Sequence, residues 1–254
     1  MAYTNSPLVS YTKLSPNHSG QRTHSIDRIT PHCVVGQCSV ETLGNIFLPT
    51  SRQASSNYGI GVDGRVGMYV EEKNRSWCSS SAANDQRAIT IECASDNTEP
   101  YAFKDMVYKR LIELCTDICR RNGKTKLLWL GDKSKTLNYT PKSDEMVLTV
   151  HRWFANKSCP GDWMYKRLEC LAKEVTDALT ETPLDNNAAD WSKNEANWAL
   201  RNGILKGDER GDLMLHSPVT REQLCVMLKR YHDLIYSPQL NKSQKTVENN
   251  SRIL

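Results

Sequence analysis

The chain has 254 residues, of which 39% are hydrophobic and 24% are charged, and its formal net charge is +4. This length accommodates one full domain and a small second one. The 33 basic residues are balanced by 29 acidic ones, which is too weak an excess to indicate nucleic-acid binding, although it mildly favours an anionic polymer as a partner. We see no run approaching the ~18 apolar residues that a membrane span needs.

The N-terminus has neither a basic segment nor a continuous apolar segment, so we expect no secretory signal. The nine cysteines are odd in number and scattered without a framework spacing. Without a signal, reduced thiols are expected. The sequence therefore predicts a protein that is made in the cytoplasm.

The first elements are predicted from turns and apolar spacing. Residues 1 to about 25 are polar and are expected to form an arm that orders on contact. Residues 28–35 read as a strand whose Pro31 marks an edge or a bulge, because proline is poorly tolerated inside a sheet. Ser39 is expected to cap a short helix, and Asp63-Gly64 to form a two-residue hairpin turn. The apolar face of that helix comprises Val40, Leu43, Ile46 and Phe47.

Later elements alternate in type. We expect strands at residues 88–93, 126–130 and 146–151, and a helix over residues 101–122 that ends at Gly123. Asp162 is expected to cap a further helix that runs through Leu168, Leu171 and Val175.

Strands interleaved with helices over about 180 residues predict an α/β fold, with a mixed central β-sheet flanked by helices. We assign residues 1–180 to this domain and the polar, proline-containing residues 181–190 to a linker. Residues 191–236 are expected to form a small helical C-terminal module. The polar residues 237–254 are predicted to be disordered.

Three residues form a candidate metal site: His32 in the first expected strand, His151 at the end of a later one, and Cys159 on the loop that follows. Catalytic zinc takes three nitrogen or sulfur ligands and keeps one position open, which this set satisfies. Each residue also has an ordinary interpretation. A histidine at a strand end is usually a satisfied polar group, and a cysteine before proline is usually a small buried hydrophobe.

Four motifs occur in order along the chain: HCVVGQ from His32, NYGIGVDG around Tyr58, AITIE ending at Glu92, and HRWFANKSCPG from His151. Over roughly residues 20–178 this combination resembles the zinc-dependent N-acetylmuramoyl-L-alanine amidases, in particular endolysins of phages that infect clostridia. Peptidoglycan recognition proteins share that fold. The resemblance implies that His32, His151 and Cys159 hold Zn²⁺.

The resemblance also implies catalytic roles. Glu92 would accept and deliver a proton, Lys157 would face the oxyanion, and Tyr58 would hydrogen-bond the metal-bound water or the substrate. Their alternatives are a solvated carboxylate at the sheet edge, a solvated loop lysine and a half-buried strand aromatic. This chain departs from the family at Pro31, where an apolar residue usually precedes the histidine, and at Cys78, where many relatives carry a histidine after the tryptophan.

The C-terminal stretch NWALRNGILKG, followed by PVTREQL, resembles one S-layer homology repeat, a module that attaches proteins to bacterial wall polymers. Thr220 and Gln223 predict a capping box at the start of a helix. Leu224, Met227, Leu228 and Tyr231 would form the apolar face of that helix. The resemblance implies wall-polymer contact, for which Arg221 is the candidate. Because such modules usually act in threes, a single copy either forms a homo-oligomer through its exposed apolar faces or binds weakly.

Together these features imply a peptidoglycan hydrolase that cleaves the amide between N-acetylmuramic acid and L-alanine. Without a signal, it would reach the bacterial cell wall after release by a holin or by lysis. Two alternatives stay open. One is a catalytically silent peptidoglycan-binding protein, and the other is a metal-free cysteine hydrolase that uses Cys159 and His151.

Overall fold

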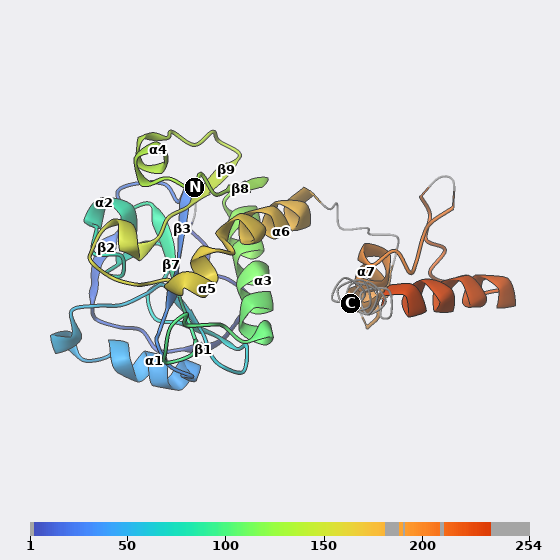
Figure 1. Ribbon diagram of the computed structural model, residues 1–254, viewed down its shortest axis with the longest axis horizontal. Helices are drawn as coiled ribbons and strands as arrows, with labels where there is room; N and C mark the ends of the chain where they lie inside the picture. The colour runs from blue at the N-terminus through green and yellow to red at the C-terminus, as the bar shows by residue number, and fades with distance from the viewer. Residues whose placement is uncertain (1–2, 181–187, 190, 209–210, 235–254) are drawn as a thin grey trace, which may run out of the picture. The chain divides into compact units, whose positions relative to one another are not determined.

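The structure is a computed structural model that describes residues 3–180, 188–189, 191–208 and 211–234 (Figure 1). The chain divides into two compact units, Met1–Thr180 and Glu181–Leu254. Most of the expected linker and the whole of the expected tail lie outside the described residues. No helix among the described residues is long and apolar enough to cross a membrane.

A seven-stranded mixed sheet in the order β1-β5-β4-β7-β3-β9-β8 forms the centre of the first unit. Strands β4 and β5 are antiparallel, whereas the other neighbouring pairs are parallel. A separate antiparallel pair joins β2 (His18–Gln21) to β6 (Asn74–Ser76). The predicted α/β fold with a mixed central sheet is confirmed. The strands of the large sheet are β1 Val9–Thr12, β3 Arg28–Cys33, β4 Tyr58–Ile60, β5 Val66–Met68, β7 Ala88–Cys93, β8 Lys126–Leu128 and β9 Glu145–Leu148.

Helices cover both faces of this sheet (Figure 1). Helices α3 and α6 pack against each other and bury their apolar faces on one side of the sheet. Helix α1 lies on the opposite face, where Leu43 approaches Gly59 of β4. The helices of this unit are α1 Val40–Phe47, α2 Ala82–Asp85, α3 Asp105–Arg121, α4 Lys133–Asn138, α5 Gly161–Tyr165 and α6 Leu168–Thr180, with 3-10 turns η1 Thr50–Arg52 and η2 His151–Trp153.

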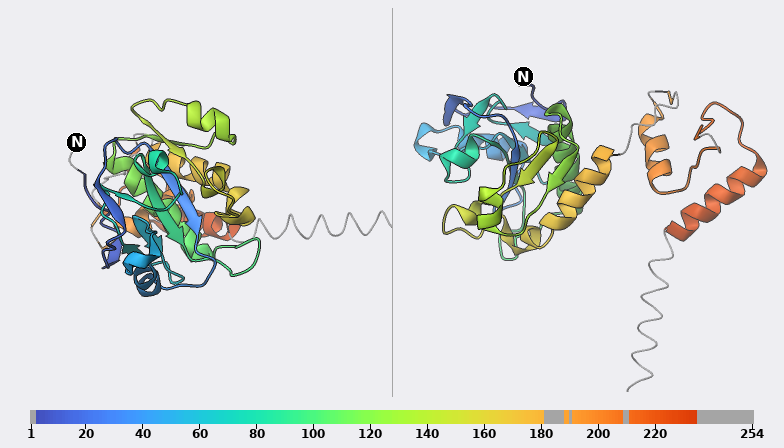
Figure 2. Two further views of the ribbon diagram at one scale, coloured as in Figure 1. Left: turned by 90° about the vertical axis from the view of Figure 1, so that its left-hand side faces the viewer. Right: turned by 90° about the horizontal axis from the view of Figure 1, so that it is seen from above.

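The two faces of the central strands differ in chemistry because side chains alternate along a strand. In β7, Ile89 and Ile91 point into the core shared with α3 and α6. Thr90 and Glu92 therefore point to the opposite face, and His32 occupies the equivalent position in β3, paired in register with Glu92. Polar functional groups are thus placed on the sheet face opposite α3 and α6. Figure 2 shows the ribbon from two further directions.

The N-terminal segment differs from the expected arm. Strand β1 pairs in parallel with β5, and β2 pairs with β6. Both strands alternate half-buried and exposed residues, so each segment covers the domain with only every second side chain. Because only alternate side chains are partly buried, these strands need few apolar residues. The segment is therefore polar in sequence although it is part of the fold.

Pro31 does not mark an edge, because β3 lies in the middle of the sheet between β7 and β9. The pairing of β3 with β9 covers only Arg28 and Ile29, and ends with a hydrogen bond from the Thr149 amide to the Ile29 carbonyl. Proline is tolerated at position 31 because the strand pairs on only one side there.

The helix expected from Asp162 is in fact two helices, α5 and α6. Asp162 lies in the first turn of α5, where its carboxylate pairs with the Arg152 guanidinium at 3.1 Å instead of capping the helix. Smaller differences concern helix α3, which begins at Asp105, and His151, which lies in the turn η2 beyond the end of β9.

Several local predictions are confirmed. The Ser39 side chain caps α1 by accepting a hydrogen bond from the Thr42 amide. Strands β4 and β5 form the expected hairpin, although its loop spans residues 61–65 and is therefore longer than two residues. Gly123 takes a left-handed φ of 67° directly after α3, as a helix-ending glycine does.

In the second unit, helix α7 (Lys193–Arg201) and a helix over residues 221–234 are described. The capping box is confirmed: the Gln223 amide donates to the Thr220 hydroxyl at 3.1 Å, and the Thr220 amide donates to the Gln223 side chain at 2.9 Å. Trp198 and Tyr231 make an edge-to-face contact. The face of the second helix that carries Leu224 and Leu228 is largely exposed within this unit.

Candidate metal centre

His32 and Glu92 are placed by the parallel pairing of β3 and β7. They are direct partners in the register, and both lie at the carboxyl ends of their strands. The Nδ1 atom of His32 is 4.0 Å from Oε1 of Glu92. The carboxyl ends of parallel strands are where open α/β sheets usually place their ligands.

The segment from His151 to Gly161 folds back on itself and brings two more candidates to the same place. The Arg152 amide donates to the Cys159 carbonyl at 3.1 Å, which ties the turn η2 to the loop that carries the cysteine. Gly161 has a left-handed φ of 81°, and a Cβ there would lie 2.8 Å from the Pro100 carbonyl oxygen. The Pro160-Gly161 turn therefore permits close packing that a larger residue would prevent.

His32, His151 and Cys159 meet in the folded chain. The Sγ of Cys159 is 3.2 Å from Nδ1 of His32, and the two imidazole rings are 5.1 Å apart between centroids. One ligand atom from each residue lies within 4.8 Å of the others. Two imidazoles and a thiol are nitrogen and sulfur donors of the kind that zinc prefers, and three protein ligands leave one coordination position open. The three residues therefore fit a catalytic metal ion.

The surroundings favour neutral forms of these groups in the absence of a cation. Burial lowers the pKa of His32 well below its usual value, and the nearby His151 lowers it further. Burial, followed by the charge of Lys157, also lowers the pKa of His151. Burial raises the pKa of the Cys159 thiol, with Cys33 adding to the effect. The neutral histidines are ready to bind a metal, whereas the thiol has to lose its proton on binding.

Glu92 has a largely buried carboxyl group with an incomplete set of hydrogen bonds, although its side chain remains 16% exposed. Burial raises its pKa to about 8. The Cys78 thiol donates a long hydrogen bond to Oε1 at 3.7 Å, whereas Oε2 is buried and has no hydrogen-bond partner among the described residues. A carboxyl group tuned toward neutral pH is suited to accept and release a proton.

Two adjoining hollows open on either side of these residues, with volumes of about 410 and 310 Å³. Cys78 and Ser80 line the first, and His32 and Cys159 line the second. Lys157, which was predicted to face the oxyanion, lines both hollows. The residues common to both are Phe47, Arg52, Glu92, His151 and Lys157.

Ser80 was not expected from the sequence. Its hydroxyl forms a hydrogen bond of 2.9 Å with Nε2 of His151, from a backbone with a left-handed φ of 62°. Uncommon backbone conformations of this kind cluster at functional sites. The run Ser79-Ser80-Ser81 carries no local signal that singles out the middle serine. Arg52 was missed for the same reason, because it approaches Glu92 only in the fold.

The structure does not bring Tyr58 to the metal centre. Its ring is fully buried, and its hydroxyl donates to Oε1 of Glu72 at 2.7 Å and accepts from the Ser6 amide at 2.9 Å. Tyr58 belongs to the face of β4 that packs into the core with α3, whereas Glu92 points to the other face. We therefore leave Tyr58 out of the candidate site.

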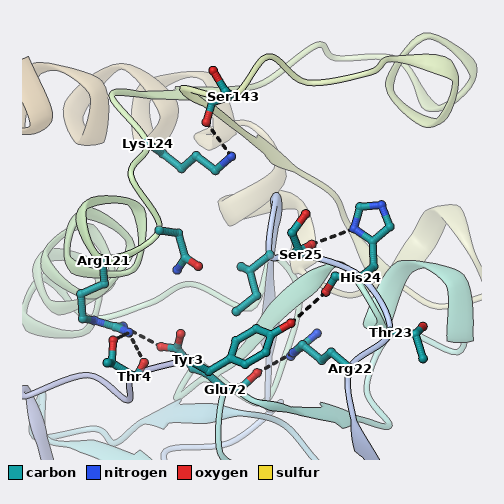
Figure 3. A pocket seen from close by; sticks show the side chains of 12 residues that line it. Tyr3, Thr4, Arg22, Thr23, His24, Ser25, Glu72, Arg121, Lys124 and Ser143 are labelled. Carbon is teal, nitrogen blue, oxygen red and sulfur yellow. Dashed lines mark hydrogen bonds and ion pairs between the residues drawn. The ribbon is translucent and has the colours of Figure 1, made fainter. Parts of the chain in front are cut away.

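A separate cavity of about 460 Å³ is lined by residues that precede β3, β8 and β9 (Figure 3). It therefore lies at the amino ends of these parallel strands, at the sheet edge opposite the metal centre. Its cations have internal partners. Arg121 pairs with Glu72, Lys124 donates to the Ser143 carbonyl, and Arg22 donates to the Glu72 carbonyl. None of the predicted site residues lines this cavity.

Residues 17–162 match the family model described as N-acetylmuramoyl-L-alanine amidase. Because this match covers more than half of the chain, the protein belongs to the N-acetylmuramoyl-L-alanine amidase family. That membership supports peptidoglycan amidase activity. No curated protein matches the sequence significantly.

The solved structures that match this chain include the following examples. An AmpD derivative is 16% identical and has a TM-score of 0.45, with 66% of this chain and 99% of that chain covered. A mutant endolysin from Bacillus subtilis is 12% identical with a TM-score of 0.44, covering 65% and 97%. The endolysin amidase LysCS from Clostridium intestinale URNW is 15% identical with a TM-score of 0.41, covering 63% and 93%.

Proposed function

We propose that the protein is a zinc-dependent endolysin that cleaves the amide bond between N-acetylmuramic acid and L-alanine in bacterial peptidoglycan. The observation that carries this proposal is the meeting of His32, His151 and Cys159, with Nδ1 of His32 only 3.2 Å from the Cys159 sulfur. A buried carboxyl group, Glu92, lies beside them. Family membership supports the choice of bond.

His32, His151 and Cys159 would hold the ion, which when bound supplies Lewis-acid chemistry by acidifying water and polarising the scissile carbonyl. Glu92 accepts a proton from the attacking water and delivers it to the amine of L-alanine as that amine leaves. Lys157 places its ammonium toward the negative oxygen that develops on the carbonyl carbon. The hollows on either side of Glu92 and His151 provide room for the glycan and for the peptide stem.

The decisive experiment compares the wild-type chain with Cys159→Ser for bound zinc and for new L-alanine amino termini released from purified cell walls. One zinc per wild-type chain, with both zinc and activity reduced in the variant, is the expected result. Cys170→Ser is the matched control, because Cys170 is exposed on α6. Metal-free protein that releases amino termini would instead indicate a hydrolase using Cys159 and His151, and metal-free, inactive protein a peptidoglycan-binding role.

We further propose that residues 191–236 act as an S-layer-homology-like module that binds wall polymers, with Arg221 as a contact residue. The confirmed capping box at Thr220 supports the helix start that this resemblance requires. Full-length Arg221→Ala should sediment less with intact cell walls than the wild type, and equally with walls stripped of their polymers. Self-association through the exposed apolar face of residues 221–234 would appear as a concentration-dependent mass.

Export through a holin or after lysis completes the proposed endolysin role. Expression of the chain inside bacteria should leave cells intact until the membrane is permeabilised, whereas lysis without permeabilisation would contradict this route.

A further inference from the structure

A second group of side chains that could bind a metal adjoins the first and shares His32 with it. The second group consists of His32, Cys78 and Glu92, one ligand atom of each lying within 4.8 Å of the others. Oε1 of Glu92 is 3.7 Å from the Cys78 sulfur and 4.0 Å from Nδ1 of His32. A tetrahedral zinc ion with bonds of about 2.0–2.3 Å places its ligand atoms about 3.3–3.8 Å apart. Only small movements would be needed to close this group around an ion.

A second observation points to a ligand at the same place. Oε2 of Glu92 is buried without a hydrogen-bond partner among the described residues. Buried polar atoms normally have partners, so each exception needs an explanation. A cation bound by the carboxylate would provide the missing interaction of Glu92.

We propose that His32, Cys78 and Glu92 form a second seat for a thiophilic divalent metal ion such as Zn²⁺, Co²⁺ or Cd²⁺. Imidazole, thiolate and carboxylate are all established zinc ligands. Binding requires the Cys78 thiol to release its proton to solvent, because the thiolate is the form that ligates metals.

The two seats exclude each other. Nδ1 of His32 is the atom closest to Glu92 and also the atom closest to Cys159. A single nitrogen lone pair binds one ion. The ion is therefore bound either by His32, His151 and Cys159 or by the ligands of the second seat. In the second seat Glu92 is a ligand and cannot accept a proton, which makes this the inactive arrangement. Only that last consequence rests on the function proposed above.

The test uses the full-length chain, stripped of metal and reloaded with Co²⁺, whose bonds to thiolates give a charge-transfer absorption band. Cys159→Ser removes the thiolate of the first group, so a band that persists has to come from another cysteine. The expected result is a persistent band in Cys159→Ser that disappears in Cys159→Ser/Cys78→Ser, with Co²⁺ affinity at least ten-fold lower in the double variant. Cys159→Ser/Cys33→Ser is the matched control and should keep the band, because Cys33 adjoins His32 without belonging to the second group.

Absence of a band in folded Cys159→Ser, or its survival in the double variant with Cys78→Ser, would overturn the second seat. The first result, together with a wild-type chain that binds zinc and cleaves peptidoglycan, would leave the proposed function intact. A wild-type chain that releases no L-alanine amino termini from cell walls, beside a Cys159→Ser chain that still shows the band, would contradict the proposed function and leave the second metal-binding group standing. If circular dichroism shows that Cys159→Ser is unfolded, the same comparison of Co²⁺ affinity with and without Cys78→Ser is made in a His151→Ala background.

Discussion

The sulfur of Cys159 lies 3.2 Å from Nδ1 of His32, although 127 positions separate the two residues in the chain. Strand β3 fixes one partner rigidly, because His32 is buried in the middle of the sheet. The other partner is carried by a loop whose shape depends on a backbone hydrogen bond between Arg152 and Cys159. A rigid strand and a tied loop therefore position the candidate metal ligands, and the catalytic roles proposed for the groups around them can be tested separately.

Lys157→Met should lower the turnover number by about 10²–10³-fold, the loss typical when a preorganised group no longer stabilises an oxyanion. The zinc content should stay unchanged, because Lys157 is not among the three metal-binding residues. Turnover on purified cell walls and metal content by mass spectrometry check both statements. Lys173→Met, which removes an exposed lysine from α6, is the control and should keep full activity. Equal turnover in Lys157→Met and the wild type would remove Lys157 from the mechanism.

Tyr58→Phe should lower the free energy of unfolding by about 1–3 kcal/mol, because the buried Glu72 carboxylate loses a donor and the Ser6 amide loses an acceptor. Hydrolysis per folded molecule should be unchanged, since Tyr58 lies away from the metal centre. Urea unfolding and wall hydrolysis measure the two effects. Tyr139→Phe removes a similar hydrogen bond to Glu145 nearer the surface and should cost less. A loss of turnover without a loss of stability would indicate that Tyr58 takes part in catalysis.

The strands and helices of the first unit could be predicted because their apolar periodicity is local information. Strand residues 88–93 and the cap at Ser39 are read correctly from a few neighbouring residues. The N-terminal strands were missed because they bury only alternate side chains. Pro31 does not mark the expected sheet edge. The sequence does not show that the pairing of β3 with β9 ends at Ile29, two residues before the proline.

The metal-binding candidates could be named from the sequence because imidazoles and thiols are recognisable metal ligands, and the resemblance to the zinc amidases selected His32, His151 and Cys159 among them. Ser80 could not be named, since a serine acquires a role only from the imidazole that the fold brings to it. The two alternatives for Tyr58 could not be decided from the sequence for a related reason. Its strand, β4, is three residues long, too short for alternation to show which side faces the core.

Gly59→Ala should destabilise the first unit by about 1–3 kcal/mol, the usual cost of overpacking. A Cβ at this position would lie 2.7 Å from the Tyr69 ring and 2.8 Å from Leu43 of α1, and both of these side chains are buried. Gly36→Ala is the matched control, because its Cβ would meet only the Cys38 sulfur at 3.4 Å. Denaturant unfolding of both variants measures the difference. Equal stability would mean that α1 can move away from the sheet at no cost.

Glu92→Gln should stabilise the metal-free protein relative to the wild type, increasingly so as the pH rises. The folded pKa of Glu92 is raised from 4.5 to about 8, so the wild-type chain loses stability as the pH rises from about 4.5 to about 8. In that range the unfolded chain ionises Glu92 freely, whereas the folded chain holds the proton. Above pH 8 the buried carboxylate is charged and the difference is constant. Glutamine has the same shape and cannot ionise, so the free energy of unfolding of Glu92→Gln lacks this pH dependence.

Urea unfolding of chelator-treated wild-type and Glu92→Gln protein at several pH values measures this divergence directly. Other buried groups, such as His32 and Asp85, titrate in both proteins, so their effects largely cancel in the difference. Zinc should reverse the order at high pH, because a cation near Glu92 stabilises its carboxylate and leaves the neutral amide unaffected. Parallel curves for the two metal-free proteins from pH 5 to 9 would mean that Glu92 ionises as easily in the fold as in water, and would remove the reason for assigning it the proton transfer.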